Sequence, residues 1–132
     1  MRFRLERVHY MPRDLEPQVL YVSEEFNTAA HLCACGCRTK IRTPLGPTEW
    51  NVEADASGPT LWPSVGNWQL PCRSHYVIRR GDVVWCEAWT AEEVAGGRAA
   101  EEQRRRAYYD ALPTHVKGLL RRLWDRLRSL FE

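Results

Sequence analysis

The sequence lacks several features that whole classes of protein require. No apolar run approaches the roughly 18 residues that a membrane-spanning helix needs. The start, MRFRLERVHY, has no apolar core followed by a small-residue cleavage site, so it does not resemble a secretory signal. The formal net charge is only +2, which argues against a surface built entirely for nucleic acid. We therefore expect a cytoplasmic protein with no membrane span and no nucleic-acid partner.

The chain also lacks the composition of a disordered protein, because 44% of its residues are hydrophobic and six are Trp. Its small net charge hides an uneven distribution. Residues 98–132 contain nine basic and five acidic residues, whereas the first 97 contain ten basic and twelve acidic residues. A mildly acidic body is therefore followed by a basic tail.

The hydrophobic pattern predicts an α+β chain, with a small, mostly antiparallel, zinc-stapled β domain over residues 1–89 and a basic helical extension over residues 90–132. Strands are expected at 2–9, 19–23, 48–53, 72–79 and 83–89, the last two forming a hairpin around the turn Arg80-Gly81-Asp82. Pro63 and Gly66 are expected to break regular structure between Leu61 and Trp68.

After Trp89 the pattern changes to a helical period. Thr90 and Glu93 resemble a capping box that opens a helix at Ala91, which Gly96-Gly97 weakens before residues 98–112 resume it. Beyond Pro113, apolar residues recur at the spacing of an amphipathic helix: Val116, Leu119, Leu120, Leu123, Trp124, Leu127, Leu130 and Phe131. This stripe could pack on the domain, dock in a partner's groove or lie on an anionic membrane.

The five cysteines are an odd number, which fits poorly with a closed disulfide framework. Cys33, Cys35 and Cys37 lie in the motif C-x-C-G-C, and Cys72 follows 35 residues later, so four thiolates could form a closed tetrahedral Zn²⁺ site. We expect this zinc to be structural, because four cysteines leave no open position for water. Small buried thiols and a catalytic cysteine are the alternatives, and Cys86 remains outside the set.

A catalytic pair follows if segments 29–35 and 72–78 are neighbouring antiparallel strands. Placing Cys33 opposite Cys72 sets His31 opposite Ser74 on the same face, where directly opposed Cβ atoms lie about 5 Å apart. A His–Ser hydrogen bond is the minimal arrangement for an activated serine nucleophile. The register is an assumption.

Other assignments stay open. Ser64 lies beside Gly66 and Asn67, whose backbone N–H groups could form an oxyanion hole, and His75 is a second candidate base. His31 could instead be a metal ligand, His75 a core residue, and Ser74 a hydrogen-bond partner of a zinc thiolate. An orienting acid could be any of four residues: Glu24, Glu25, Glu49 and Asp82. Trp50, Trp62, Trp68, Trp85 and Trp89, with Tyr76, could fill the core or line a peptide groove.

The segments HLCACGCRTKIRTPLGPTEW and LWPSVGNWQLPCRSHYVIRRGDVVW resemble the bacterial domain-of-unknown-function family numbered 6527. The resemblance covers roughly Val19 to Trp89 and does not include the basic tail. Some members are encoded beside bacterial ubiquitin-like proteins and their activating-enzyme-like and conjugating-enzyme-like partners.

The resemblance implies a peptidase that processes a ubiquitin-like protein at its C-terminal tail or removes it from targets. Its chemistry would fall on Ser74 as nucleophile, with His31 or His75 as base. The alternative is a non-catalytic zinc-ribbon-like adaptor that binds a protein partner in the same pathway. A nucleic-acid-binding zinc module is disfavoured by the balanced charge of the cysteine-rich body.

Overall fold

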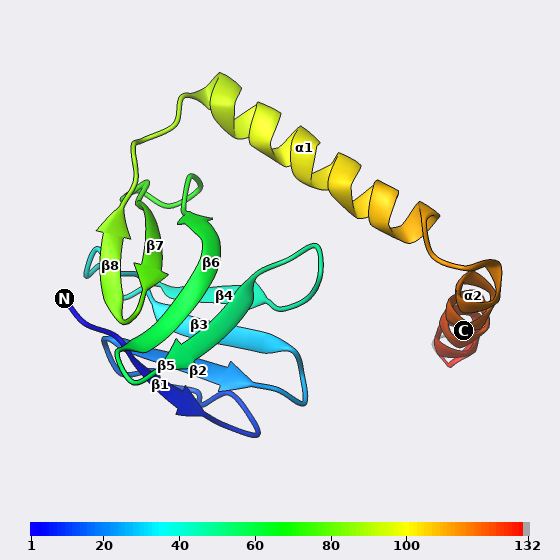
Figure 1. Ribbon diagram of the computed structural model, residues 1–132, viewed down its shortest axis with the longest axis horizontal. Helices are drawn as coiled ribbons and strands as arrows, with labels where there is room; N and C mark the ends of the chain where they lie inside the picture. Colours follow the sequence, from blue (N-terminus) through cyan, green and yellow to red (C-terminus); the bar gives the residue numbers. More distant parts are fainter. Residues whose placement is uncertain (131–132) are drawn as a thin grey trace. The chain divides into compact units, whose positions relative to one another are not determined.

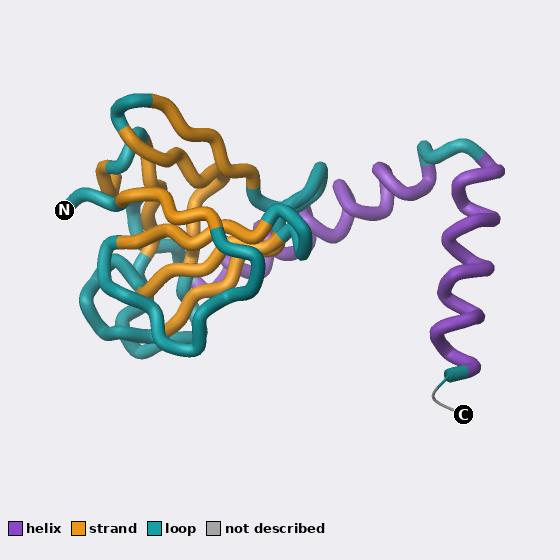
Figure 2. Tube along the Cα trace, turned by 90° about the horizontal axis from the view of Figure 1, so that it is seen from below, coloured by secondary structure: helices purple, strands orange, loops and turns teal. Residues whose placement is uncertain are grey.

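The computed structural model describes residues 1–130 and divides into two compact units, Met1–Ala91 and the part of the chain from Glu92 onward. Strands make up the first unit and helices the second, as Figure 2 shows by colour. The expected α+β class, with a mostly antiparallel β domain before C-terminal helices, is confirmed. Phe131, the last residue of the predicted apolar stripe, lies outside the described residues.

The first sheet has the order β1-β2-β3-β4 (Figure 1). Its strands are β1 (Arg4–Arg7), β2 (Val19–Ser23), β3 (Thr28–Leu32) and β4 (Lys40–Pro44). β1 and β2 run parallel, and the other neighbours are antiparallel. β4 was not predicted; its two buried residues, Ile41 and Thr43, alternate with less buried ones in a short segment, KIRTP, that carries two basic residues.

The second sheet has the order β5-β6-β7-β8, and all its neighbours are antiparallel. Its strands are β5 (Asn51–Asp55), β6 (Gly58–Gly66), β7 (His75–Arg79) and β8 (Asp82–Trp85). The predicted hairpin of β7 and β8 is present, with Arg79 opposite Asp82. β6 continues through Pro63, which follows a cis peptide bond, but its register shifts between Leu61 and Val65 and it ends at Gly66. The expected irregularity between Leu61 and Trp68 is therefore present, although Pro63 does not end the strand.

One hydrophobic core joins the two sheets. Leu20 and Val22 of the first sheet and Leu61 and Ile78 of the second are all buried in the same cluster. Burial of such side chains is worth about 1.5–3 kcal/mol each, which makes this core the main stabilising element of the unit. The sheets therefore hold β3 and β7 on opposite sides of a shared core.

The assumed pairing of segments 29–35 and 72–78 is wrong. β3 pairs with β2 and β4, whereas β7 pairs with β6 and β8. Cysteines of the two segments nevertheless meet, because Cys33 follows the end of β3 and Cys72 precedes the start of β7. Four cysteines can come together at a metal site when the loops that carry them converge. Their proximity therefore does not determine how the strands pair.

The helical unit contains α1 (Ala91–Asp110) and α2 (Thr114–Ser129). α1 begins at the predicted Ala91 and runs without interruption through Gly96-Gly97, so the predicted weakening does not break it. Pro113 ends the connection between the helices and precedes the first turn of α2, where its missing N–H costs nothing. Neither helix, within the described residues, is long and apolar enough to cross a membrane.

Candidate active site and metal centre

The four predicted ligand cysteines lie together in the strand unit, Met1–Ala91. The Sγ atom of Cys33 is 3.4 Å from that of Cys35 and 3.9 Å from that of Cys72, and all four Sγ atoms, including that of Cys37, lie within 4.8 Å of one another. Gly36 supports this arrangement with a positive φ of 92°, which lets the chain turn between Cys35 and Cys37. The cluster could hold a metal ion.

The sulfur geometry fits zinc. In a tetrahedral site with Zn–S bonds of about 2.3 Å, neighbouring sulfurs lie about 3.8 Å apart. The separations of 3.4 and 3.9 Å from Cys33 Sγ bracket this value, and none of the six separations exceeds 4.8 Å. The donor set is also chemically suitable, because thiolates are the ligands that structural zinc sites prefer.

Hydroxyl groups around the cluster favour the thiolate form that binds metals. Hydrogen bonding to the Ser74 hydroxyl lowers the pKa of Cys72, and the Thr39 hydroxyl, 3.3 Å from Cys37 Sγ, lowers the pKa of Cys37 to about 6. Such outer-shell donors orient the ligands of a metal site.

Ser74, the first candidate nucleophile, lies against this cluster. Its Oγ accepts a hydrogen bond from Asn67 Nδ2 at 2.9 Å and lies 3.1 Å from Cys33 Sγ. The hydroxyl proton can therefore point to the sulfur. Within the described residues, no histidine forms a hydrogen bond with Ser74 Oγ. The arrangement matches the alternative in which Ser74 is a partner of a zinc thiolate.

His31, the first candidate base, lies in the core. Its Nε2 is 2.7 Å from the Tyr76 hydroxyl, and its Nδ1 has no hydrogen-bond partner among the described residues. Burial lowers the pKa of the imidazole to about 4, which makes it a weak base at neutral pH. His31 and Ser74 are thus not brought together as a pair.

The structure instead brings together Ser64 and His75, the two remaining candidates. Ser64 Oγ lies 2.9 Å from His75 Nε2. On the other side of the ring, His75 Nδ1 lies 2.7 Å from the backbone carbonyl oxygen of Glu87. A carbonyl oxygen can only accept, so Nδ1 must carry a proton, and in the neutral imidazole Nε2 is then the acceptor. His75 is therefore held in the tautomer that can take a proton from Ser64.

A β-bulge places Ser64 beside this histidine. Between Leu61 and Val65, β6 spans four residue steps, whereas β7 spans only two between their partners Ile78 and Tyr76. Bulges of this kind re-aim side chains. The Trp50 indole also donates a hydrogen bond to the Ser64 carbonyl at 3.3 Å, which anchors the bulge to the residue that precedes β5. Ser64 stays partly exposed, as a nucleophile must.

Two tryptophans enclose the imidazole of His75, which is only 7% exposed. The ring centroids of Trp68 and Trp89 lie 4.9 and 5.1 Å from that of His75, and the two indoles stack on each other at 5.7 Å. Trp68 is further held by the Arg73 guanidinium, 5.7 Å from its centroid. These ring contacts, with the hydrogen bonds at both ring nitrogens, restrict the orientation of the histidine.

The cysteine cluster and the Ser64–His75 pair share their supporting segments. Asn67, three residues after Ser64, donates its backbone N–H to the Ser74 carbonyl at 2.8 Å and contacts Cys33 Sγ at 3.6 Å through its side chain. Ser74 in turn directly precedes His75. Any metal in the cluster would therefore stiffen both segments that carry the pair.

Sequence reasoning missed two parts of this arrangement. The Asn67 N–H, suggested as an oxyanion donor, is already donated to Ser74. Three of the four suggested orienting acids pair elsewhere: Glu24 with Arg7, Glu25 with His9 and Asp82 with Arg2. The carbonyl of Glu87 orients the ring instead, and no sequence signal could have found it, because every residue has a carbonyl.

Comparison with known proteins supplies one match. The model of a family described as "Bacterial ubiquitination-like system serine protease (BubE)" matches residues 7–86, well over half of the chain. This description supports the expected connection to bacterial ubiquitination-like systems, although it names a related family and not specifically the numbered one. No curated protein and no solved structure matches the chain.

Proposed function

The chain belongs to the family of bacterial ubiquitination-like system serine proteases (BubE), and within that activity we propose that Ser64 is the nucleophile and His75 its general base. The observation that carries the proposal is the 2.9 Å contact between Ser64 Oγ and His75 Nε2, together with the carbonyl of Glu87 that fixes the tautomer. A nucleophile, a base and a group that orients the base are the three parts of a serine hydrolase site.

In the proposed reaction, Ser64 Oγ forms a bond to the carbonyl carbon of the scissile peptide or isopeptide bond while its proton passes to His75 Nε2. The imidazolium, stabilised through Nδ1–H by the Glu87 carbonyl, then gives that proton to the leaving amine as the C–N bond breaks. Water, deprotonated by His75, releases the acyl group from Ser64. The carbonyl of Glu87 takes the place that a carboxylate occupies in the Ser-His-Asp triad.

We propose that the four cysteines Cys33, Cys35, Cys37 and Cys72 hold a structural zinc ion. Four thiolates complete a tetrahedral shell, so a bound zinc would supply folding energy and no open position for substrate. Its role in activity would be indirect, through Asn67 and Ser74.

The tryptophan enclosure of His75 gives a first prediction. A Cβ at Gly66 would lie 2.5 Å from Trp68 Nε1, closer than such atoms approach, and Trp68 has little room to move between Trp89 and Arg73. Gly66→Ala should displace the indole and tilt His75, lowering kcat/KM about 10²-fold. Activity and melting temperature measured side by side check this. Gly118→Ala, at a half-buried helical position where an added Cβ meets no atom within 4 Å, is the matched control. An unchanged kcat/KM for Gly66→Ala would contradict the prediction.

As substrate we propose the extended C-terminal tail of a ubiquitin-like protein. A hollow on the second sheet is lined by Asn51, Glu53, Thr60, Trp62, Val77, Arg79 and Val84. On β7, Val77 and Arg79 share the face of His75, because strand side chains repeat every two residues, and Trp62 lies two residues before Ser64. An extended chain along this face would therefore reach the pair. Trp62, 60% exposed, supplies its largest apolar surface.

Trp62→Ala should separate tail binding from chemistry. We expect KM for a ubiquitin-like precursor to rise about tenfold, from the loss of apolar contact, with little change in kcat on a small activated ester. Trp124→Ala is the control, since Trp124 is equally exposed at 60% but lies in the helical unit. Equal losses on both substrates would place Trp62 in the chemistry and contradict its role in tail binding.

The whole proposal is tested by incubating the protein with a ubiquitin-like precursor that carries extra residues after its C-terminal glycine. We expect a mass loss equal to those residues. A fluorophosphonate probe should label one serine, and peptide mapping should find the label on Ser64. Binding of the precursor without cleavage or labelling would favour the adaptor, and a label on Ser74 would overturn the assignment of the nucleophile.

A further inference from the structure

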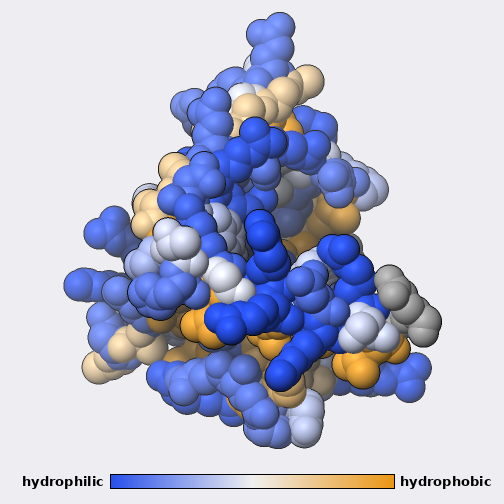
Figure 3. Space-filling view, turned by 90° about the vertical axis from the view of Figure 1, so that its right-hand side faces the viewer, coloured by the Kyte–Doolittle hydropathy of each residue, from blue (hydrophilic) through white to orange (hydrophobic). Residues whose placement is uncertain are grey.

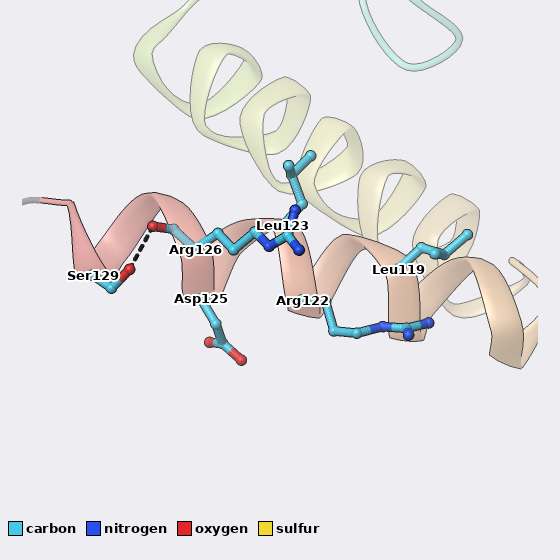
Figure 4. Close-up of a pocket in the computed structure, with 6 residues that line it drawn as sticks. All are labelled: Leu119, Arg122, Leu123, Asp125, Arg126 and Ser129. Atoms are coloured by element: carbon cyan, nitrogen blue, oxygen red, sulfur yellow. Dashed lines mark hydrogen bonds between the residues drawn. The ribbon is translucent and has the colours of Figure 1, made fainter.

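The helix α2 is amphipathic, and none of its residues is fully buried in the described structure. Five large apolar side chains along it, and Leu130 directly after its end, are between 44% and 76% exposed: Leu119, Leu120, Leu123, Trp124, Leu127 and Leu130. Figure 4 shows Leu119 and Leu123 on one side of α2 and Asp125 on the other. A stripe of this kind has to be covered by something in the cell.

The charges of α2 are arranged in relation to this stripe. At about 100° per residue, the apolar side chains span an arc of about 140°. Lys117, Arg121 and Arg128 border one side of the arc, and Arg122 and Arg126 border the other. The only acid of the helix, Asp125, lies on the face opposite the stripe. Figure 3 shows hydrophobic side chains among hydrophilic ones on the face of the molecule that it displays.

The charge pattern points to an occupant outside the chain. The strand unit contains ten basic and ten acidic residues, so it offers no opposite net charge to α2. A second copy is also disfavoured, because a symmetric pairing of two α2 stripes would set arginine borders against arginine borders. A protein groove would need acids along both of its rims.

An anionic bilayer meets all of these requirements at once. Its acyl region accepts an apolar stripe, and its phosphate headgroups surround the helix on both sides, where long arginine side chains can reach them. Trp124, at the edge of the stripe, would lie at headgroup level, where tryptophan is preferred. At 16 residues, α2 is too short to span the bilayer and suits a position along its surface.

We propose that α2 binds the surface of membranes rich in anionic phospholipids and holds the protease there as a peripheral membrane protein. The inference rests on α2 alone and does not depend on the identity of the nucleophile. It would restrict cleavage to ubiquitin-like proteins and conjugates near the membrane.

The test is flotation of the full-length protein with vesicles of phosphatidylglycerol and phosphatidylcholine, compared with vesicles of phosphatidylcholine alone. We expect at least about tenfold tighter binding to the anionic vesicles, weakened by added salt. The double variant Arg122→Gln with Arg126→Gln should weaken vesicle binding about 25-fold, because each lost charge should reduce affinity roughly fivefold. Leu123→Gln should weaken it at least about tenfold, through lost apolar burial.

The matched control removes the same two charges from α1, by Arg98→Gln with Arg104→Gln, and should weaken binding less than about threefold. Fluorophosphonate labelling of each variant reports that the strand unit is intact. A vesicle-induced blue shift of tryptophan emission should disappear in Trp124→Phe. Equal binding to both vesicle types, or equal losses in the α1 and α2 variants, would overturn the proposal. So would a protein that does not bind vesicles but forms dimers that Leu123→Gln dissociates.

Discussion

Replacing Ser64 by alanine should lower kcat/KM for a ubiquitin-like precursor about 10⁴-fold or more, which is the scale of loss when a serine hydrolase loses its nucleophile. The Ser64 hydroxyl has one hydrogen bond among the described residues, to His75 Nε2. Its removal should therefore change the free energy of unfolding by no more than about 1 kcal/mol. Steady-state kinetics and a thermal melt of the same preparation measure the two effects.

Ser74→Ala is the decisive comparison, because Ser74 is the other serine that the sequence offered as a nucleophile. It removes contacts to Cys33 and Asn67 and leaves the Ser64–His75 hydrogen bond in place. We expect zinc affinity to fall about 10–100-fold and activity to persist when zinc is in excess. Full activity of Ser64→Ala together with an inactive, folded Ser74→Ala would contradict the assignment.

The same contrast applies to the histidines. His75→Gln should abolish cleavage while the protein stays folded, whereas His31→Gln should act mainly on stability, because His31 is fully buried against Tyr76 and Phe3. Activity normalised to the fluorophosphonate-labelled fraction separates the two effects. A His31 variant that is folded and fully labelled but inactive would show that His31 takes part in the reaction.

The local features of this chain were predictable from sequence. The β7–β8 hairpin follows from two β-type segments around Arg80-Gly81-Asp82, and the α2 helix follows from its apolar period. The convergence of the four cysteines also follows from their chemistry, since a metal site explains three alternating thiols and a fourth far along the chain.

The pairing of serine and histidine was not predictable in the same way. The assumed register treated Cys33 and Cys72 as opposed strand residues, whereas they lie in loops that approach from different sheets. The contact between Ser64 and His75 depends on a bulge of two extra residues in β6, and periodicity cannot reveal a bulge. The orienting carbonyl depends on where the chain passes after β8, which is a property of the packed fold.

Loss of the cysteine cluster should have the second large effect. Cys33 is the buried member, with Cys35, Cys72, Ser74 and Asn67 all in contact with its sulfur. Structural zinc sites contribute on the order of 10 kcal/mol to folding, comparable to the total stability of a domain of this size. We expect Cys33→Ala to lose the metal and to lower the melting temperature of the strand unit by at least about 15 °C. Zinc analysis and calorimetry measure both quantities.

Cys86→Ala is the control for this experiment, because Cys86 is the cysteine outside the cluster. Its sulfur donates a hydrogen bond to the Val84 carbonyl at 3.9 Å and takes no part in the thiol contacts of the cluster. This variant should retain zinc, melting temperature and activity. A chelator should reproduce the Cys33→Ala effect in the unmodified protein, and the loss of activity should follow the loss of structure around Asn67 and Ser74, since those residues connect the cluster to Ser64 and His75. The contrary result is a protein that is purified without zinc and whose melting temperature is changed neither by chelator nor by Cys33→Ala. It would show that the four thiols are ordinary buried or surface cysteines and that the site is held by packing alone.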